Sequence, residues 1–174
     1  MDIAIREMEK GDWSRVAEIY YQGILSDMAT FETVLPSFEV WDRAHLRGCR
    51  LVAEGDRGVA GWAALLPYSD RACFKGVAEL SVYVDVNHKR QGVGEALLRE
   101  LCAESDKAGF WSLQSVIFQE NLGSIALHEK CGFRSIGFRE RLAKDRNGVW
   151  RNVVLMERRI RADNSGLPPS SLRA

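Results

Sequence analysis

A basic turn with two glycines is the part of the sequence whose residue types most directly suggest chemistry. The stretch HKRQGVGEALL, residues 88–98, lies between a strand-like segment, ELSVYVDV, and a helix-like segment. The first backbone N–H groups of a helix have no intrahelical partner and bind anions, and glycines let a phosphate approach that backbone closely. The spacing therefore predicts either a phosphate site or a tight structural turn at a helix start.

Two common nucleotide-binding patterns are excluded in this turn. A P-loop requires G-x-x-x-x-G-K-[ST], which the stretch lacks. A dinucleotide-binding fingerprint requires a third glycine or an alanine at position 97, where the sequence has Leu97. The phosphate interpretation must therefore rest on the context of the turn.

The segment before the turn contains one acidic residue in an apolar or neutral run. Glu79 is the only acid of VAELSVYV, and strand alternation places it on the same face as Ser81 and Tyr83. Partial burial would raise the pKa of this carboxyl group toward a value suited to proton transfer, directly or through a water. The alternative is a strand glutamate paired with a neighbouring Arg or Lys.

A second pattern follows the turn, N-x-x-S-x-x-x-H-x-x-x-G-F from Asn121 to Phe133. Together the two patterns resemble the GNAT superfamily of acetyl-CoA-dependent N-acetyltransferases. Its signature is Q/R-x-x-G-x-G/A, followed by a helix, a strand and an N-x-x-S/A segment. Here the signature runs from Lys89 to Gly94, and Lys89 departs from the family's Gln or Arg.

Within the superfamily, the chain is more similar to the phosphinothricin and methionine-sulfone acetyltransferase branch. The segments 78–94, 121–133 and 29–32 carry this similarity, and the resemblance as a whole covers about residues 3–160. It implies the GNAT fold, with about seven mostly antiparallel strands, a splayed central pair and helices on both faces. It also implies acetyl-CoA held in the splay, with its pantetheine arm paired to strand backbone like an added strand.

The resemblance assigns the coenzyme contacts to the strand, the turn and the second pattern. Strand backbone would pair with pantetheine and stabilise the thioester oxygen, and turn backbone would hold the pyrophosphate. Asn121 resembles the family's pantetheine contact, whereas Lys130 could equally be a solvated helix lysine. The predicted coenzyme-binding residues are Val82, Tyr83, Val84, Lys89, Arg90, Gln91, Gly92, Val93, Gly94, Glu95, Asn121, Ser124 and Lys130.

Acetyl transfer to an amine requires loss of a proton from the amine, stabilisation of the thioester oxygen and protonation of the leaving thiolate. The resemblance places the catalytic glutamate at Glu79. Candidates for protonating the thiolate are His128, where many family members carry tyrosine, and Tyr83. His128 could instead bond the coenzyme or nearby helix backbone. A covalent route through Cys131 is disfavoured, because nothing in the sequence places a base beside it.

The acceptor is expected to be a small amine. A polar and aromatic loop holds Arg71, Phe74 and Lys75, and the resemblance puts at Arg71 the arginine that would bind an acidic group. Phe31 and Glu32 would shape the same pocket, next to Glu79. The resemblance implies direct transfer to the α-amine of a small acidic amino-acid analogue. Examples are phosphinothricin, methionine sulfoximine or sulfone, and a related arsinic or phosphinic glutamate analogue.

Two other functions remain compatible with these residues. One is the same chemistry on another amine, such as a protein N-terminus, an aminoglycoside or a polyamine. The other is an acyl-CoA-binding sensor without catalysis. The charged loop with Arg71 and Lys75 argues mildly against cationic substrates, and the intact turn and Glu79 argue against a sensor.

The elements that must position these residues form a mixed α/β pattern. Helices are expected after Asp12 and Ser37, from the turn to about residue 108, and within 121–133; strands are expected over 3–8, 50–54, 59–67, 77–86, 111–118 and 150–159. The order predicts one domain over residues 1–160 with helices on both faces of a sheet. The tail, 161–174, is expected to be disordered.

The amino-acid composition limits which binding partners and cellular locations are expected. The 174 residues include 24 Lys plus Arg and 24 Asp plus Glu, and this zero net charge argues against nucleic acid. The four cysteines form no C-x-x-C pair and no cluster with histidine, which predicts no metal and free thiols in a reducing cytosol. Neither a signal peptide nor a run of ~20 apolar residues is present, so we expect a cytoplasmic protein away from membranes. The branch resemblance implies a homodimer.

Overall fold

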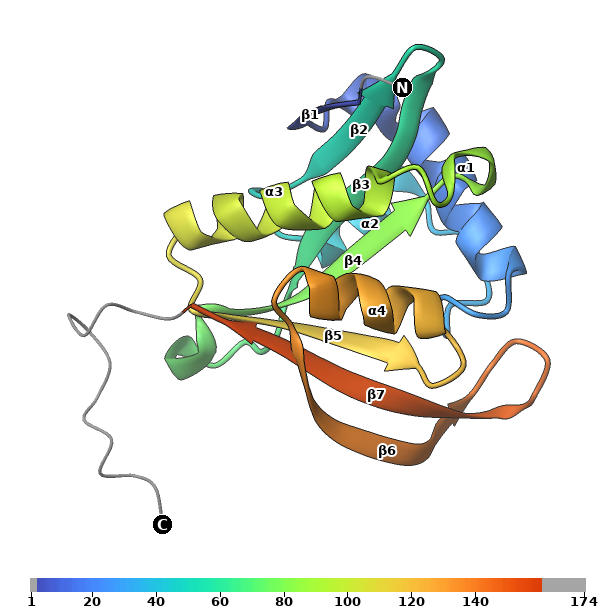
Figure 1. Ribbon diagram of the computed structural model, residues 1–174, viewed down its shortest axis with the longest axis vertical. Coiled ribbons are helices and arrows are strands. Elements are labelled where there is room, and N and C mark those ends of the chain that lie inside the picture. Colours follow the sequence, from blue (N-terminus) through green and yellow to red (C-terminus); the bar gives the residue numbers. More distant parts are fainter. Residues whose placement is uncertain (1–2, 161–174) are drawn as a thin grey trace.

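The computed structural model describes residues 3–160, which form one seven-stranded sheet and four α-helices (Figure 1). The strands are β1 Ala4–Glu7, β2 Leu51–Gly55, β3 Gly58–Pro67, β4 Val77–Val84, β5 Ser112–Phe118, β6 Arg134–Lys144 and β7 Trp150–Arg159. The helices are α1 Trp13–Leu25, α2 Phe38–Ala44, α3 Val93–Lys107 and α4 Leu122–Lys130, with 3-10 turns at Lys10–Asp12, Ala72–Phe74 and Val86–His88. The tail predicted to be disordered, 161–174, lies outside the described residues.

The sheet has the order β1-β2-β3-β4-β5-β7-β6, and only β4 and β5 are parallel neighbours. These two strands pair only where Val77–Glu79 lies beside Ser112–Gln114. Beyond those positions they diverge, whereas β4 stays paired with β3 as far as Val84 (Figure 1). The predicted mixed, mostly antiparallel sheet with a splayed central pair is confirmed.

Helices cover both faces of the sheet, as predicted (Figure 1). α3 buries Leu97 and Leu101 on one face, against the strand residue Leu113. On the other face, α1 buries Ile19 beside Trp62 of β3. Because successive strand side chains point to opposite faces, β4 contributes to both cores, and this fixes which of its residues face the splay.

The two predicted helix caps differ in their chemistry. Ser37 caps α2, because its hydroxyl accepts a hydrogen bond from the Val40 N–H at 3.4 Å. Asp12 immediately precedes α1 but makes no side-chain cap to it. Its carboxylate instead pairs with Arg6 at 2.8 Å and accepts from the Glu9 N–H at 2.8 Å. The ion pair with β1 therefore holds the carboxylate away from the helix.

The sequence pattern did not predict β6. This strand is an edge strand with mostly exposed side chains, including Ile136 and Phe138. Its pairing with β7 shifts register twice, between Ser135 and Gly137 and between Arg139 and Ala143. Such irregularities break the period of two by which a strand is recognised, and an edge strand with few buried residues gives a weak pattern at best.

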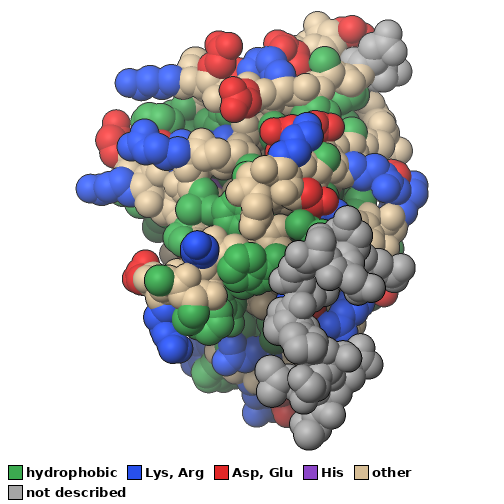
Figure 2. Space-filling view, turned by 90° about the vertical axis from the view of Figure 1, so that its left-hand side faces the viewer, with side chains coloured by type: hydrophobic (Ala, Val, Ile, Leu, Met, Phe, Trp, Pro, Cys, Tyr) green, Lys and Arg blue, Asp and Glu red, His purple; other side chains and the backbone are tan. Residues whose placement is uncertain are grey.

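The expectations about membrane spans and metal sites can be compared with residues 3–160. No helix there is long and apolar enough to cross a bilayer. In the same residues, no group of three or more His, Cys, Asp and Glu side chains could hold a metal ion. The face drawn in Figure 2 carries basic and acidic side chains together.

Gly76, immediately before β4, provides a test of packing. A Cβ at this position would overlap the ring of Trp111, and the Gly76 carbonyl also accepts the Trp111 N–H at 2.8 Å. We expect Gly76→Ala to lower the free energy of unfolding by about 1–3 kcal/mol, because the ring cannot be displaced without loss of packing. Urea denaturation measures the change. Gly11→Ala is the matched control, because a Cβ there meets nothing within 4 Å. Equal stabilities of the two variants would contradict the prediction.

Candidate active site

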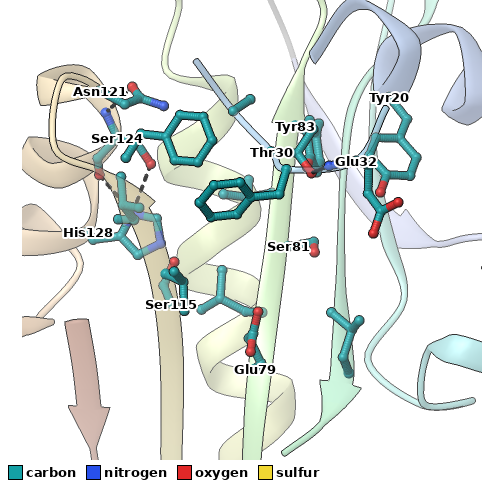
Figure 3. A pocket seen from close by; sticks show the side chains of 18 of the residues that line it. Tyr20, Thr30, Glu32, Glu79, Ser81, Tyr83, Ser115, Asn121, Ser124 and His128 are labelled. Atoms are coloured by element: carbon teal, nitrogen blue, oxygen red, sulfur yellow. Dashed lines mark hydrogen bonds between the residues drawn. The ribbon is translucent and has the colours of Figure 1, made fainter. Parts of the chain in front are cut away.

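The splay between β4 and β5 opens into a cavity of about 290 Å³ (Figure 3). The diverging strands supply its walls through residues 79–83 and 115–118. The loop after α1, residues 29–32, and the α4 residues Ser124 and His128 line the remaining sides. The cavity therefore exists because the two central strands stop pairing.

Glu79 lies at one end of this cavity, at the last position where β4 pairs with β5 (Figure 3). Burial alone raises the pKa of its carboxyl group above the ordinary value. Within residues 3–160 no ion pair or hydrogen bond of its side chain offsets this effect. Of the two roles considered from the sequence, the geometry therefore favours a proton-transfer group over a structural ion pair.

His128 lines the cavity from α4, and 1% of its surface is exposed. Its Nδ1 lies 2.7 Å from the Ser124 carbonyl oxygen, so Nδ1 carries a proton and donates it to this bond. Burial lowers the pKa of the ring, and the bond to Ser124 offsets this only in part. The ring is therefore neutral, and its buried Nε2, which has no partner in the described residues, bears a lone pair. A group in this state accepts a proton more readily than it donates one.

Tyr83 borders the cavity from the α1 side of the sheet. Its ring stacks on Trp62 with centroids 4.9 Å apart and lies 4.9 Å from the ring of Tyr20. Burial raises the pKa of its hydroxyl, and the charge of Glu32 adds to this effect. The hydroxyl therefore keeps its proton at neutral pH and can donate a hydrogen bond into the cavity.

A second and larger cavity, of about 830 Å³, lies between α1, α3 and α4 and is called the groove below. The residues that line both cavities are Ala29, Val82, Tyr83, Asn121 and Ser124. Val84 and the start of α3 line only the groove. The two spaces thus meet at the exposed edge of β4, where a long ligand in the groove would deliver its end to the cavity.

The glycine turn forms the wall of the groove at the start of α3. Arg90 and Gly92 have φ angles of 60° and 83°, so the chain turns through left-handed conformations and aligns backbone N–H groups. The first intrahelical bond is accepted by the Gly92 carbonyl from the Ala96 N–H, which leaves the N–H groups before Ala96 free. Gly94 serves packing instead, because a Cβ there would lie 3.1 Å from the Leu127 side chain. The turn is suited to an anion.

Most side chains of the predicted coenzyme site line the groove, and one turns away from it. Lys89, Arg90 and Glu95 line the groove, but Gln91 does not. The Gln91 amide turns back and donates to the Asn87 carbonyl at 2.9 Å, so a contact of Gln91 with the coenzyme would use its backbone N–H, as predicted for this turn. Val93 and Ser124 also line the groove, and Lys130 lines it with its ammonium paired to Glu95 at 2.5 Å.

Asn121 borders both cavities, but its side chain is already occupied. Its Oδ1 caps α4 by accepting from the Ser124 N–H at 3.2 Å, and its Nδ2 donates to the Met28 carbonyl at 3.0 Å. The amide thereby holds the loop after α1 over the passage between the two cavities. Its predicted pantetheine contact would have to use the backbone or replace one of these bonds.

The predicted substrate residues are only partly brought together. Phe31 and Glu32 line the cavity, and Phe31 packs edge-on against Phe118 at 4.7 Å. Arg71, Phe74 and Lys75 do not line it. The 3-10 turn there holds the Arg71 guanidinium over the Phe74 ring at 5.3 Å, on the outside of the sheet end. Within one chain, the predicted substrate contacts of these three residues are therefore not formed.

Several polar residues of the cavity were not predicted as site residues from the sequence, among them Tyr20, Thr30 and Ser115. Thr30 lies in the segment 29–32 that carries the branch similarity, but it was given no role, and neither Tyr20 nor Ser115 was a candidate. Burial and the charge of Glu32 raise the pKa of Tyr20 to about 12. No local pattern could have identified them, because the loop after α1 and the ends of β4 and β5 are distant in sequence.

Comparison with known proteins agrees with this arrangement. The model of the Acetyltransferase (GNAT) family matches residues 7–133. The chain belongs to the GNAT acetyltransferase family. It is 31% identical to the phosphinothricin N-acetyltransferase of Streptomyces viridochromogenes, over 90% of this chain and 87% of the relative. It is 30% identical to the phosphinothricin N-acetyltransferase of Alcaligenes faecalis, over 94% of this chain and 86% of the relative.

A solved structure extends the similarity to the coenzyme. The phosphinothricin acetyltransferase of Sinorhizobium meliloti in complex with acetyl-CoA superimposes with a TM-score of 0.86 at 27% identity, covering 98% of this chain and 95% of that chain. This GNAT protein is accordingly an acetyl-CoA-dependent N-acetyltransferase. The features that fit the coenzyme are the free N–H groups at the start of α3, the exposed edge of β4 and the 830 Å³ groove.

Proposed function

We propose that this GNAT enzyme transfers acetyl groups directly to the α-amine of a small acidic amino-acid analogue of the phosphinothricin and methionine sulfoximine class. The relatives with phosphinothricin N-acetyltransferase activity in their names support the substrate class. One observation carries the chemistry: the half-buried Glu79 carboxylate, with no ionic partner in residues 3–160, lines a cavity that adjoins the groove.

Glu79 has the role of the base in this proposal. An ammonium has no lone pair, so the acceptor must lose a proton before it attacks the thioester. The raised pKa of Glu79, caused by burial, makes it a stronger base than an exposed glutamate. His128 accepts rather than donates, so its Nε2 is assigned to hold the amine or a water that relays the proton.

The β4 backbone and Tyr83 supply the hydrogen-bond and proton donors that the reaction needs besides a base. Acetyl-CoA supplies the acetyl group as a thioester when it is bound. The edge of β4 that faces β5 has no strand partner beyond Glu79, and its N–H groups stabilise charge on the thioester oxygen. The Tyr83 hydroxyl, which keeps its proton, donates to the departing sulfur. Of the two candidates left open by the sequence, Tyr83 is therefore the one proposed as the donor.

The acidic end of such a substrate needs a cation, and the cavity formed by one chain is lined by no Lys or Arg among residues 3–160. Arg71 and Lys75 are exposed on the end of the sheet. We propose that the enzyme acts as a homodimer in which this loop completes the cavity of a second copy.

A second class of acceptor has one observation in its favour. Glu32 and Glu79 are the charged residues that line the cavity within one chain. A cationic amine, such as a polyamine, would be attracted by these two carboxylates without help from a second chain. This alternative keeps the chemistry and changes only the substrate.

The base assignment predicts opposite effects of Glu79→Gln on activity and on stability. We expect kcat to fall roughly 10²- to 10⁴-fold, because the amine loses its proton acceptor. At pH 7.5 the variant should unfold at a higher temperature than the wild type, because the ionised carboxylate is disfavoured by burial. Because the pKa of Glu79 is higher in the folded than in the unfolded state, the folded wild type takes up a proton first and becomes more stable as pH falls. The difference in melting temperature between wild type and variant should therefore shrink toward a pH of about 4.5.

Steady-state kinetics and thermal melts at the two pH values measure these effects. Glu32→Gln is the matched control, because it removes an exposed carboxylate from the same cavity. A Glu79→Gln enzyme with full kcat at neutral pH would refute the assignment.

The substrate class is tested by acetyl-CoA consumption over a panel of amines. Phosphinothricin, methionine sulfoximine and methionine sulfone should give the highest kcat/KM, above spermidine, an aminoglycoside and a peptide with a free N-terminus. Turnover of spermidine alone would favour the cationic alternative and leave the chemistry intact.

If the loop with Arg71 completes the cavity of a second copy, two variants that are inactive alone should complement each other. Glu79→Gln and Arg71→Ala should each be inactive on phosphinothricin, and co-expression should restore activity, because a mixed dimer contains one site with both wild-type residues. The mass in solution should be that of a dimer. No recovery in verified mixed dimers would show that Arg71 does not act across the interface.

A further inference from the structure

A buried carboxylate lies behind the phosphate turn. Asp85 follows β4, and 1% of its side chain is exposed. Its Oδ1 accepts from His88 Nδ1 at 2.8 Å and from the Asn87 N–H at 3.0 Å; its Oδ2 accepts from Arg15 at 2.7 Å and from Gln22 at 2.9 Å. Burial opposes ionisation, but these hydrogen bonds outweigh it and hold the pKa of Asp85 well below its usual range. Asp85 is therefore a permanently ionised, fixed acceptor.

His88 lies between that carboxylate and the groove. Its side chain is 8% exposed, and it lines the groove together with Lys89 and Arg90. Because an ionised carboxylate only accepts, Nδ1 must donate to Asp85. Nε2 has no hydrogen-bond partner in residues 3–160. A ring more than nine-tenths buried thus has one polar atom left for a ligand of the groove.

The surrounding charges favour an anionic ligand at this atom. Lys89 and Arg90 line the same wall, and Arg15 shares the Asp85 carboxylate from the α1 side. Glu95 is the acid that α3 contributes to the groove, and its charge is offset by Lys130 and by Arg99 at 3.0 Å. The groove near His88 therefore has unpaired positive charge beside the start of α3.

We infer that His88 is a side-chain ligand for the pyrophosphate of the coenzyme, donating from Nε2, and that Asp85 positions it. The inference rests on the acetyl transfer proposed above and adds a side chain to a site otherwise formed by backbone. Because Nδ1 is committed to Asp85, Nε2 donates only when the ring is an imidazolium. In that state the ring would bridge the Asp85 carboxylate and a phosphate through two charge-assisted hydrogen bonds.

Asp85 acts through His88 and also through the turn. Gln22 donates to the Asp85 carboxylate and accepts the Val86 N–H at 3.0 Å, so α1 holds the 3-10 turn Val86–His88 in place. Without the carboxylate, the ring would lose the hydrogen bond that fixes its orientation. Asp85 is a positioning residue, and His88 is the contact.

Three acetyl donors separate a phosphate contact from general distortion. We expect His88→Gln to raise KM for acetyl-CoA about tenfold, the value of a charge-assisted hydrogen bond, with kcat little changed. The same increase is expected with 3′-dephospho-acetyl-CoA, which keeps the pyrophosphate. S-acetylpantetheine has no phosphate, so wild type and variant should use it with equal kcat/KM.

Two further variants complete the design. His45→Gln is the matched control: His45 is also buried, with Nδ1 bonded to the Trp41 carbonyl at 2.8 Å, and it lies outside the groove. Its KM for acetyl-CoA should equal that of the wild type. Asp85→Asn should raise this KM, and the double variant with His88→Gln should be no worse than the worse single variant, because the two act as a unit.

The outcomes that overturn the inference are distinct. An unchanged KM in His88→Gln, or an equal loss on S-acetylpantetheine, would show that His88 is structural. A loss confined to acetyl-CoA and absent with the 3′-dephospho donor would refute the pyrophosphate assignment. Calorimetric binding of CoA needs no acceptor, so weaker binding by His88→Gln would support the inference even if every proposed amine failed to react.

Discussion

The short pairing between β4 and β5 is the constraint on which the rest of this structure depends. The strands share only three paired positions, 77–79 with 112–114, and then separate. The free edge of β4 needs hydrogen-bond partners, because backbone polar groups are rarely left unsatisfied. It therefore suits a ligand that pairs like a strand. The same separation creates the cavity, so the binding edge and the reaction chamber have one origin.

Local hydrogen bonding gives two carboxylates of one chain segment opposite properties. Glu79 has no partner in residues 3–160, and burial raises its pKa. Asp85 is more deeply buried, yet donors on three sides lower its pKa. The first is suited to taking up a proton and the second to fixing its neighbours. Desolvation acts on both, and the number of donors decides which effect prevails.

Charge is also divided between the two cavities. The cavity in the splay is lined by Glu32 and Glu79, whereas the groove is lined by Lys89, Arg90 and the start of α3. An ammonium is attracted to the first and a phosphate to the second. The zero net charge of the chain conceals this separation, because it sums over regions of opposite sign.

Much of the fold followed from periodicity and turn residues, because those signals are local. The alternation around Glu79, the glycine turn and the helices after it are examples. β6 was missed because two register shifts break its alternation. The place of Gln91 in the motif did not indicate where its side chain lies, and its amide bonds to the Asn87 carbonyl. Arg71 was assigned to the pocket, but the turn that holds it lies outside the cavity of its own chain.

The sequence by itself determined the family resemblance, the residue types of the site and their order along the chain. Only the tertiary structure decided the protonation state of His128, the isolation of Glu79 and the four bonds on Asp85. The physical reason is that a pKa and a hydrogen-bond partner depend on neighbours in space. Here those neighbours come from α1, β4 and α4, which the sheet brings together from distant parts of the sequence.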